Sequence, residues 1–316
     1  MKSDKLLQNS WVVGSLALLC TALWGSAFPV IKIGYNLLGI GSAAVGSQIL
    51  FAGLRFTMAG VLTILLGSLT ARKPLIPKKR SLGMVLRLCM LQTVIQYFFF
   101  YVGVANTSGV KSAIITGTNS LLAIAIASLI FRQEKLGCAK LLGCLAGFLG
   151  VIIANMAPSG LNLGFTLQGE GFVFLAAVSY AFSSVFLKRY SQKENPVTLS
   201  GWQFSAGGLV LLAVGGAMGG RLGHFTWGGA GILVYLALLS AIAYSVWGIL
   251  LQYNPVSRVA IYGFANPVIG VLLSALLLGE DSQAFSVKNV AALILVSLGI
   301  FIVNRYSGTK APGEVK

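Results

Sequence analysis

Gly150-Val-Ile-Ile-Ala-Asn155 and Gly299-Ile-Phe-Ile-Val-Asn304 are nearly the same short sequence, and each closes a long apolar run. The two stretches lie almost half the length of the 316-residue chain apart. Similarity at such a distance indicates that one structural unit occurs twice in the chain. Further matching segments are then expected in the same order along the two halves. The fold depends on what kind of segments these are.

The apolar composition of the chain indicates a membrane protein. Hydrophobic residues make up 56% of the sequence and charged residues only 9%, with a mean hydropathy of +0.86. A soluble protein carries about 25% charged residues. Apolar stretches of roughly 20 residues recur along the chain, and this is the length that a helix needs to cross the hydrocarbon core. We therefore expect an all-α integral membrane protein.

The net charge of +16 does not indicate nucleic-acid binding here. The basic residues lie in short loops between apolar runs, where they set the topology, so we expect no nucleic-acid partner. The four cysteines show no ligand spacing, and the single histidine, His224, lies in a glycine-rich loop. We accordingly expect no metal site, no cofactor and no catalytic residue.

Polar breaks divide the apolar sequence into ten predicted membrane-spanning segments. Their approximate bounds are 11–35, 47–70, 81–104, 108–131, 137–156, 169–190, 198–217, 228–252, 255–278 and 286–306. Boundaries read from a sequence carry an error of a few residues.

Lysine and arginine gather in alternate loops between these segments. The rich loops include Arg72, Lys73, Lys78, Lys79, Arg80, Arg132, Lys135, Lys140, Lys188, Arg189, Lys193 and Arg258. The opposite side holds Arg221, with Lys111 and Lys288 just inside their segments and the acids Glu170, Glu280 and Asp281. By the positive-inside rule, both termini are predicted to be cytoplasmic.

Five segments in each half mean that the second half enters the membrane upside down. Polar and aromatic matches follow in order along the two halves. They are Trp24 and Tyr180, Arg55-Phe56 and Gln203-Phe204, Tyr97 and Tyr244, and Asn119 and Asn266. The sequence therefore predicts two inverted five-helix repeats, which is the architecture of many secondary transporters.

Several stretches resemble the drug/metabolite transporter superfamily, in its two-domain EamA type. They are Ala22-Leu-Trp-Gly-Ser-Ala-Phe-Pro-Val30, Ala241-Ile-Ala-Tyr-Ser-Val-Trp247 and Asn266-Pro-Val-Ile-Gly-Val-Leu-Leu-Ser-Ala-Leu-Leu-Leu-Gly-Glu280. The first half departs from the pattern, with Ser120 where the second half has Pro267. The resemblance implies EamA repeats at 11–156 and 168–306, between cytoplasmic tails at 1–10 and 307–316. It also implies a central cavity lined by the first, third, fourth, sixth, eighth and ninth segments.

Polar and aromatic side chains within these segments are the candidates for substrate contact, because a polar group in hydrocarbon is costly unless it faces a cavity or another helix. The candidates are Trp24, Ser26, Phe28, Arg55, Gln92, Gln96, Tyr97, Thr116, Asn119, Tyr180, Ser183, Ser184, Gln203, Tyr244, Trp247, Tyr262 and Asn266. Pro29 and Pro267 are predicted helix breaks or hinges. For any single serine or threonine, an ordinary interhelical hydrogen bond is the favoured alternative.

The helical period makes further predictions about faces. It is expected to put Gln92, Gln96, Phe99 and Gly103 on one face, and Tyr262 on one face with Asn266. Gly143, Gly147 and Gly150 form a face of small residues, which serves either internal packing or a dimer seam. Both a monomer and a homodimer stay open, although internal packing is the favoured use of this face.

The charged residues within the predicted segments restrict the charge class of the substrate. All seven acidic residues lie in tails, loops or segment edges, so the carboxylate of a proton-coupled exporter of cationic drugs is missing. Arg55 lies deep in the second segment and either faces the cavity or, alternatively, snorkels or pairs with backbone carbonyls. If Arg55 faces the cavity, a neutral, zwitterionic or weakly anionic metabolite fits better than a cation.

The sequence thus predicts a multi-pass secondary transporter in the cell membrane, without enzymatic activity. We expect it to export a small metabolite such as an amino acid by alternating access around a central site. Its partners would be the small-molecule substrate and the lipid bilayer. The alternatives are a cationic drug/proton antiporter and a non-transporting receptor or scaffold.

Overall fold

The computed structural model describes residues 5–41, 43–107, 109–155, 165–223, 226–278 and 287–306, and these are helical apart from short connections. In the first half the helices are α2 (Ser10–Leu37), α3 (Val45–Ala71), η1 (Lys79–Ser81), α4 (Leu82–Leu88), η2 (Cys89–Ile95), α5 (Gln96–Ala105), α6 (Gly109–Ala125), η3 (Ile126–Ile130) and α7 (Cys138–Asn155). In the second half they are η4 (Leu167–Gly171), α8 (Phe172–Tyr190), α9 (Pro196–Ala217), α10 (Trp227–Tyr253), α11 (Val256–Ala260), η5 (Ile261–Phe264), α12 (Ala265–Leu278) and α14 (Val287–Tyr306).

Six described segments are long and apolar enough to cross a membrane. They are Ser10–Leu37, Val45–Ala71, Lys79–Ala105, Leu167–Tyr190, Pro196–Ala217 and Trp227–Tyr253. Shorter apolar helices occupy Ile114–Ile130, Cys138–Ile153 and Val290–Arg305. The prediction of a multi-pass, all-helical protein is therefore confirmed for the described residues, while the count of ten spans stays a prediction.

Local sequence explains several helix ends. The side chains of Asn9, Asn195 and Thr226 accept hydrogen bonds from backbone N–H groups in the first turns of α2, α9 and α10. These amide and hydroxyl oxygens satisfy donors that a helix start leaves unpaired. Pro196 follows Asn195 at the first helical position of α9, where the missing N–H of proline costs nothing.

A seam of glycines joins α3 to α9. Glycine recurs every seven residues in both helices, at Gly46, Gly53, Gly60 and Gly67 and at Gly201, Gly208 and Gly215. A Cβ atom added at Gly60 would lie 2.3 Å from the backbone nitrogen of Ser205, and one at Gly208 would lie 2.3 Å from that of Thr57. The two backbones therefore touch along the seam, which only glycine permits.

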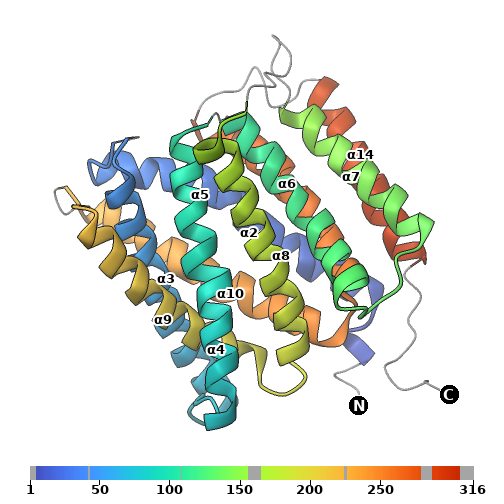
Figure 1. The fold of residues 1–316 in the computed structure, drawn as a ribbon, viewed down its shortest axis with the longest axis horizontal. Helices are drawn as coiled ribbons and strands as arrows, with labels where there is room; N and C mark the ends of the chain where they lie inside the picture. The colour runs from blue at the N-terminus through green and yellow to red at the C-terminus, as the bar shows by residue number, and fades with distance from the viewer. Residues whose placement is uncertain are drawn as a thin grey trace.

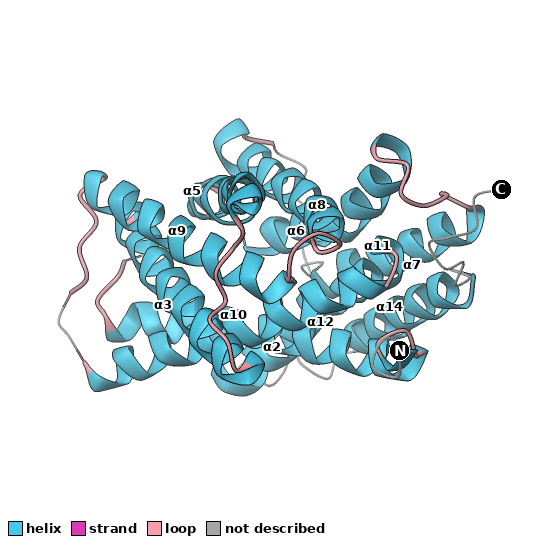
Figure 2. Cartoon of the chain, turned by 90° about the horizontal axis from the view of Figure 1, so that it is seen from below, coloured by secondary structure: helices cyan, strands magenta, loops and turns pink. Residues whose placement is uncertain are grey.

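The α3–α9 seam also shows that the two repeats are inverted. Gly46, at the start of α3, faces Met218 beyond the end of α9, whereas Gly67 near the end of α3 faces Val197 near the start of α9. These are the second helices of the two repeats, so equivalent helices run antiparallel. Figures 1 and 2 show α3 and α9 side by side at one end of the molecule.

A second antiparallel seam joins α7 to α14 at the opposite end of the molecule (Figure 1). Cβ atoms added at Gly143 and Gly150 would meet the backbone of Gly299 and Ala292 at 2.9 and 2.8 Å. A Cβ atom at Gly299 would lie 2.9 Å from the backbone nitrogen of Gly147. The small-residue face predicted from the sequence thus serves internal packing between the last helices of the two repeats.

The first helix of each repeat packs against the third and fourth segments of the other. α2 contacts α10 and α12, and α8 contacts α5 and α6 in the corresponding way. This exchange is what a two-fold relation between the halves requires. Because α10 also contacts α8, the four helices α2, α10, α8 and α5 are joined by successive contacts.

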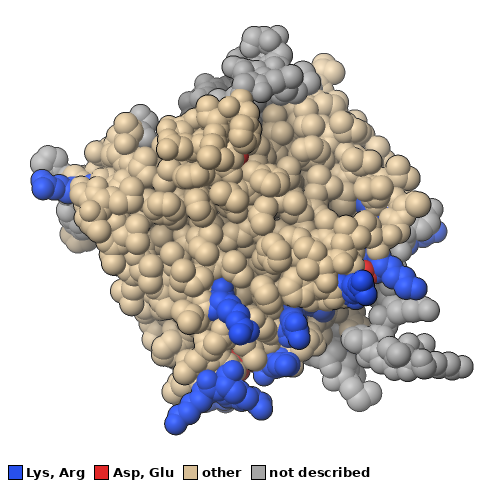
Figure 3. Space-filling model, in the orientation of Figure 1, with Lys and Arg blue, Asp and Glu red and all other residues tan. Residues whose placement is uncertain are grey.

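One end of the helix bundle collects both the start of α2 and the basic loops. Arg258 Nη2 donates to Ser10 Oγ at 2.7 Å, and Asn254 Nδ2 donates to the carbonyl of Leu7 at 2.9 Å, so α2 begins beside α11. In Figure 3 most of the lysine and arginine side chains lie along the lower edge of the visible face. The uneven distribution of lysine and arginine agrees with the predicted topology. That this end of the bundle faces the cytoplasm stays a prediction.

Candidate functional site

Four aromatic rings at the centre of the molecule repeat the two-fold relation of the halves. Tyr97 of α5 and Tyr244 of α10 share a hydrogen bond of 2.9 Å between their hydroxyl oxygens. Phe56 of α3 stacks on Phe204 of α9, with ring centroids 5.2 Å apart. Tyr97 lies 4.3 Å from Phe56, and Tyr244 lies 4.7 Å from Phe204. Each residue therefore contacts its own counterpart from the other repeat.

Two polar contacts flank these rings in equivalent places. Arg55 Nε donates to Ser240 Oγ at 3.1 Å, and Thr93 Oγ1 donates to Gln203 Oε1 at 2.7 Å. Ser240 precedes Tyr244 by one helical turn, as Thr93 precedes Tyr97. Gln203 Nε2 also donates to Gln92 Oε1 at 3.1 Å, which extends the second contact into a chain of three side chains. The arrangement is symmetric in position but not in chemistry.

The two polar contacts differ in chemistry because Arg55 carries a positive charge, whereas its counterpart Gln203 is neutral. The side chain of Arg55 is 3% exposed and lies 5.1 Å from the centroid of the Phe56 ring. Tyr35, Tyr97, Tyr101 and Tyr244 all lie close enough to interact electrostatically with it. The acids that the structure describes, Glu134, Glu170 and Glu194, hydrogen bond elsewhere. The side chain of Arg55 is therefore buried among helices, which argues against the alternative of snorkelling, while its contact with substrate stays a prediction.

Tryptophans extend the aromatic cluster on the side of α2. The Trp24 ring lies 5.0 Å from Tyr244 and 4.9 Å from Trp247, so three predicted site residues from α2 and α10 form one contact group. Tyr180 of α8 is the sequence counterpart of Trp24 in the other repeat. Ser183 and Ser184 instead donate to the carbonyl of Tyr180 within their own helix, at 2.7 and 3.0 Å. Their hydroxyl groups are thus used within α8 and not in the interhelical hydrogen bonds favoured above for single serines, and their role in substrate contact stays a prediction.

Four predicted site residues carry buried polar atoms that have no hydrogen-bond partner among the described residues. They are Trp24 Nε1, Gln96 Oε1, Asn119 Oδ1 and Asn266 Oδ1. Asn119 and Asn266 are each other's counterparts in the two repeats, and their side chains show the same unpaired oxygen. Buried polar groups in proteins are almost always paired, so unpaired ones point to strain or to a partner from outside the chain.

Ser26 and Tyr262 contact residues outside this centre. Ser26 Oγ pairs with the partly exposed Tyr235 hydroxyl at 2.7 Å. The Tyr262 hydroxyl lies beside Gly14 in the first half of α2, 3.0 Å from where a Cβ atom would be. Thr116 is half-buried in α6, and the side chain of Phe28 lies outside the described residues. Their predicted role in substrate contact stays untested.

Two predicted faces fail because the helices are not regular α-helix. Residues 89–95 form the π-helix η2, which turns Gln92 toward Gln203 of α9, whereas Phe99 packs on Phe172 of α8 at 4.9 Å. Residues 261–264 form the 3₁₀-helix η5, so the α-helical period that was expected to put Tyr262 and Asn266 on one face does not hold there. A π-turn has more, and a 3₁₀-turn fewer, residues than the α-helical period assumes.

The two prolines do not break their helices at mid-length. α2 continues through Pro29 to Leu37. Pro267 lies in the first turn of α12, directly after η5, where a missing N–H is tolerated. The predicted break at Pro29 is therefore wrong for this structure, while a hinge role for either proline stays a prediction.

Sequence reasoning missed Thr93 and Tyr101, which are 0% and 5% exposed. Thr93 could have been found from its spacing, because it stands before Tyr97 as Ser240 stands before Tyr244. Tyr101 follows Tyr97 by one turn and has glycine, Gly248, at the matching place of the second repeat. No repeat signal marks Tyr101.

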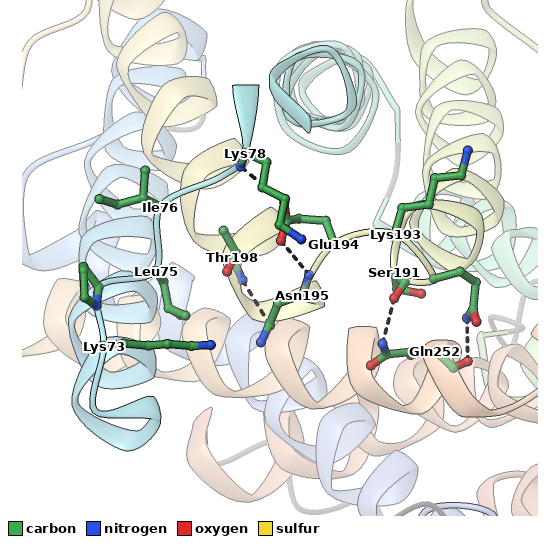
Figure 4. A pocket seen from close by; sticks show the side chains of 12 residues that line it. Lys73, Leu75, Ile76, Lys78, Ser191, Lys193, Glu194, Asn195, Thr198 and Gln252 are labelled. Atoms are coloured by element: carbon green, nitrogen blue, oxygen red, sulfur yellow. Dashed lines mark hydrogen bonds between the residues drawn. The ribbon is translucent and has the colours of Figure 1, made fainter. Parts of the chain in front are cut away.

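A pocket lies away from this centre, at the basic end of the bundle. It has a volume of about 460 Å³ and opens between the loop after α3, the loop between α8 and α9, and Gln252 at the end of α10 (Figure 4). Lys73, Lys78 and Lys193 line it together with Glu194. None of the predicted site residues lines this pocket.

Glu134 links the two repeats by hydrogen bonds at the same basic end of the bundle. Its carboxylate accepts hydrogen bonds from the backbone N–H of Ser257 in α11 at 2.9 Å, from the Ser257 hydroxyl, and from Lys140 Nζ at 2.5 Å. The side chains of Glu134 and Lys140 are 8% and 11% exposed. This contact joins the end of the fourth segment to the start of the ninth.

Replacing Glu134 by glutamine is expected to lower the free energy of unfolding by about 3 kcal/mol, because it leaves the charge of Lys140 buried without a partner. Denaturation by a titrated anionic detergent measures the loss. Lys135→Gln, at the exposed neighbouring position, serves as the control. Equal stability of the two variants would contradict the linking role of Glu134.

Comparison with known proteins agrees with the architecture. The family model described as the EamA-like transporter family matches residues 12–156 and 167–305. An uncharacterized transporter of Archaeoglobus fulgidus is 31% identical over 94% of this chain and 99% of its own. A probable amino-acid metabolite efflux pump of Salmonella typhimurium is 27% identical over 92% of this chain and 93% of its own.

Further similarities agree on the class of protein and on the fold. An uncharacterized inner membrane transporter of Escherichia coli K12, YedA, is 29% identical over 89% of both chains. A solved crystal structure shares the fold, with a TM-score of 0.75 over 93% of this chain and 97% of its own, at 18% identity. With its two matched repeats and their antiparallel seams, this chain belongs to the EamA-like transporter family.

Proposed function

We propose that this protein is a secondary transporter that exports a small metabolite bearing a carboxylate, such as a neutral, zwitterionic amino acid. The observation that carries the proposal is the buried guanidinium of Arg55 at the centre, with no carboxylate among its described contacts. A charged group in a membrane interior needs a partner, and such residues mark substrate pathways. A substrate carboxylate is the partner that arginine binds best, through two parallel hydrogen bonds.

The other central residues suit the rest of such a substrate. The unpaired atoms of Trp24, Gln96, Asn119 and Asn266 offer one donor and three acceptors. An ammonium group needs acceptors, and the amide oxygens supply them. The rings of Phe56, Phe204, Trp24 and Trp247 provide apolar surface for a small side chain, as in other ligand sites.

The repeat supports alternating access as the mechanism. Because the second repeat is an inverted copy of the first, exchanging the conformations of the two repeats would open the site to the opposite side. The contact of Glu134 with Ser257 would hold one side closed, and its release would open that side. Ten spans, cytoplasmic termini and a location in the cell membrane belong to this proposal, supported by the loop charges.

A cationic drug/proton antiporter is the less favoured candidate, because a buried arginine at the site repels a cation. Among the described residues, no carboxylate lies at the centre to exchange a proton for a drug. The relative of Salmonella typhimurium, named a probable amino-acid metabolite efflux pump, supports both the amino-acid class and the outward direction. The family and the names of the relatives favour transport over catalysis or a scaffold role.

Flux of labelled solutes through proteoliposomes tests the proposed function. We expect neutral amino acids to move at a rate that depends on the protein, whereas purines and organic cations move as in empty liposomes. Flux of organic cations alone would contradict the proposed substrate class. Absence of flux for every solute, with the protein folded, would favour a receptor or scaffold.

A further inference from the structure

A basic groove opens between α4 and the end of α8, outside the centre. It has a volume of about 310 Å³ and is lined by four cationic residues, Arg80, Arg87, Arg189 and Lys193, beside the rings of Phe186 and Tyr190. All four cationic residues are exposed. α4 belongs to the first repeat and α8 to the second, and the two helices pack against each other. The fold thus brings together cations from two distant parts of the chain.

Among the residues that the structure describes, no carboxylate lines the basic groove. The acid next to it in sequence, Glu194, faces the neighbouring pocket of Figure 4 instead. There it accepts hydrogen bonds from Ser81 Oγ at 2.7 Å and from the backbone N–H groups of Lys78 and Asn195. Burial raises the pKa of Glu194, but these hydrogen bonds outweigh it and hold the pKa below its usual value. The negative charge of Glu194 is therefore engaged outside the basic groove.

Tyr190 holds one of the four cations in place. Arg87 Nη1 donates to the Tyr190 hydroxyl at 3.1 Å, and the Tyr190 ring stacks on Phe186 with centroids 5.5 Å apart. Tyr190 itself is 5% exposed. Because a guanidinium carries five N–H donors, this single bond orients Arg87 and leaves further donors for an anion. The groove is thus partly preorganised.

An apolar strip adjoins the groove on the next face of the same segment. Leu82, Leu86 and Met90 follow one another at intervals of four residues and are 54%, 62% and 38% exposed. They belong to the apolar segment Lys79–Ala105, which is long enough to cross a membrane. The cations suit the phosphate of a phospholipid headgroup, and the adjoining apolar strip suits its acyl chains. A water-soluble anion would contact the cations but not the strip.

We propose that the basic groove binds the headgroup of an anionic phospholipid. The phosphate diester lies among Arg80, Arg87 and Arg189, and the acyl chains follow Leu86 of α4 and Met90 of η2. Clustered basic residues at the membrane surface attract anionic lipids in this way. The bound lipid joins the start of the third segment to the end of the sixth, the segments that carry Tyr97 and Tyr180.

Native mass spectrometry of the full chain, titrated with phosphatidylglycerol or phosphatidylcholine, tests the proposal. We expect phosphatidylglycerol to bind more tightly, and the double variant Arg87→Gln/Arg189→Gln to lose about 30-fold in affinity for it. The double variant Lys73→Gln/Lys78→Gln removes the same charge from the neighbouring pocket and is expected to change the affinity less than about threefold. Unchanged thermal stability shows that both variants fold.

Three results would overturn the proposal. The first is equal affinity for phosphatidylglycerol and phosphatidylcholine, which shows no preference for the anionic headgroup. The second is an equal loss in the two double variants, which shows a diffuse effect of charge. The third is full displacement of phosphatidylglycerol by millimolar glycerol 3-phosphate, which assigns the groove to a soluble anion.

Discussion

Replacing Arg55 by glutamine is expected to reduce the transport efficiency for a zwitterionic amino acid by about 30-fold or more. The loss follows from the charge-assisted hydrogen bonds that a carboxylate would make to the guanidinium. Gln203 already occupies the equivalent place in the other repeat, so the Arg55→Gln variant makes the two sides of the aromatic centre alike. Initial rates of flux in proteoliposomes, measured across substrate concentrations, give the efficiency.

Two further variants separate the charge of Arg55 from its packing. Arg55→Lys keeps the charge but loses the two-pronged geometry, so we expect it to recover only part of the activity. Arg72→Gln removes the same charge at the exposed end of α3 and is expected to leave transport unchanged. If the glutamine variant folds and transports amino acids at the wild-type rate, Arg55 does not bind the carboxylate.

Replacing Gly60 or Gly208 by alanine is expected to lower the free energy of unfolding by about 3 kcal/mol, the upper range for overpacking. The added Cβ atom would lie 2.3 Å from a backbone nitrogen of the opposite helix, and a backbone cannot move aside as a side chain can. The seam must open, which also separates Phe56 from Phe204. Detergent denaturation and flux assays are therefore both expected to show a loss.

Gly216→Ala provides the matched control in α9. No atom lies within 4 Å of a Cβ atom added there, so the alanine finds open space. Alanine favours helix over glycine by about 1 kcal/mol in water, so stability is expected to hold or rise. A loss at Gly216 as large as that at Gly208 would mean that glycine acts through the helix itself and not through the seam.

The repeat was the most predictable part of the fold, because inverted copies leave their marks in the sequence. The matches of Tyr97 with Tyr244 and of Phe56 with Phe204 came from sequence order alone, and the structure puts both pairs in contact. The sequence also carries the glycine seam of α3 and α9, since glycine recurs every seven residues in both helices. This period does not stand out among the 39 glycines of the chain. Only the distances between the two helices show that their backbones approach closely at these glycines.

The candidate site was less predictable, since it depends on helix irregularities that the sequence does not mark. Gln92 and Phe99 point to different helices because η2 is a π-helix, and the 3₁₀-helix η5 breaks the α-helical period around Tyr262, whose hydroxyl lies beside Gly14 of α2. Ser26 meets Tyr235, a residue far away in sequence, through the crossing of α2 and α10. Such pairings are set by how the helices pack, which periodicity within one helix cannot determine.

Counterflow in proteoliposomes tests the central claim most directly, because a site that faces one side at a time links outward and inward movement. Vesicles loaded with an unlabelled neutral amino acid are diluted into a trace of the same labelled solute. We predict transient accumulation of label inside the loaded vesicles, with the wild-type protein and not with Arg55→Gln. Uptake that is the same with and without internal amino acid would contradict a carrier with an alternating central site.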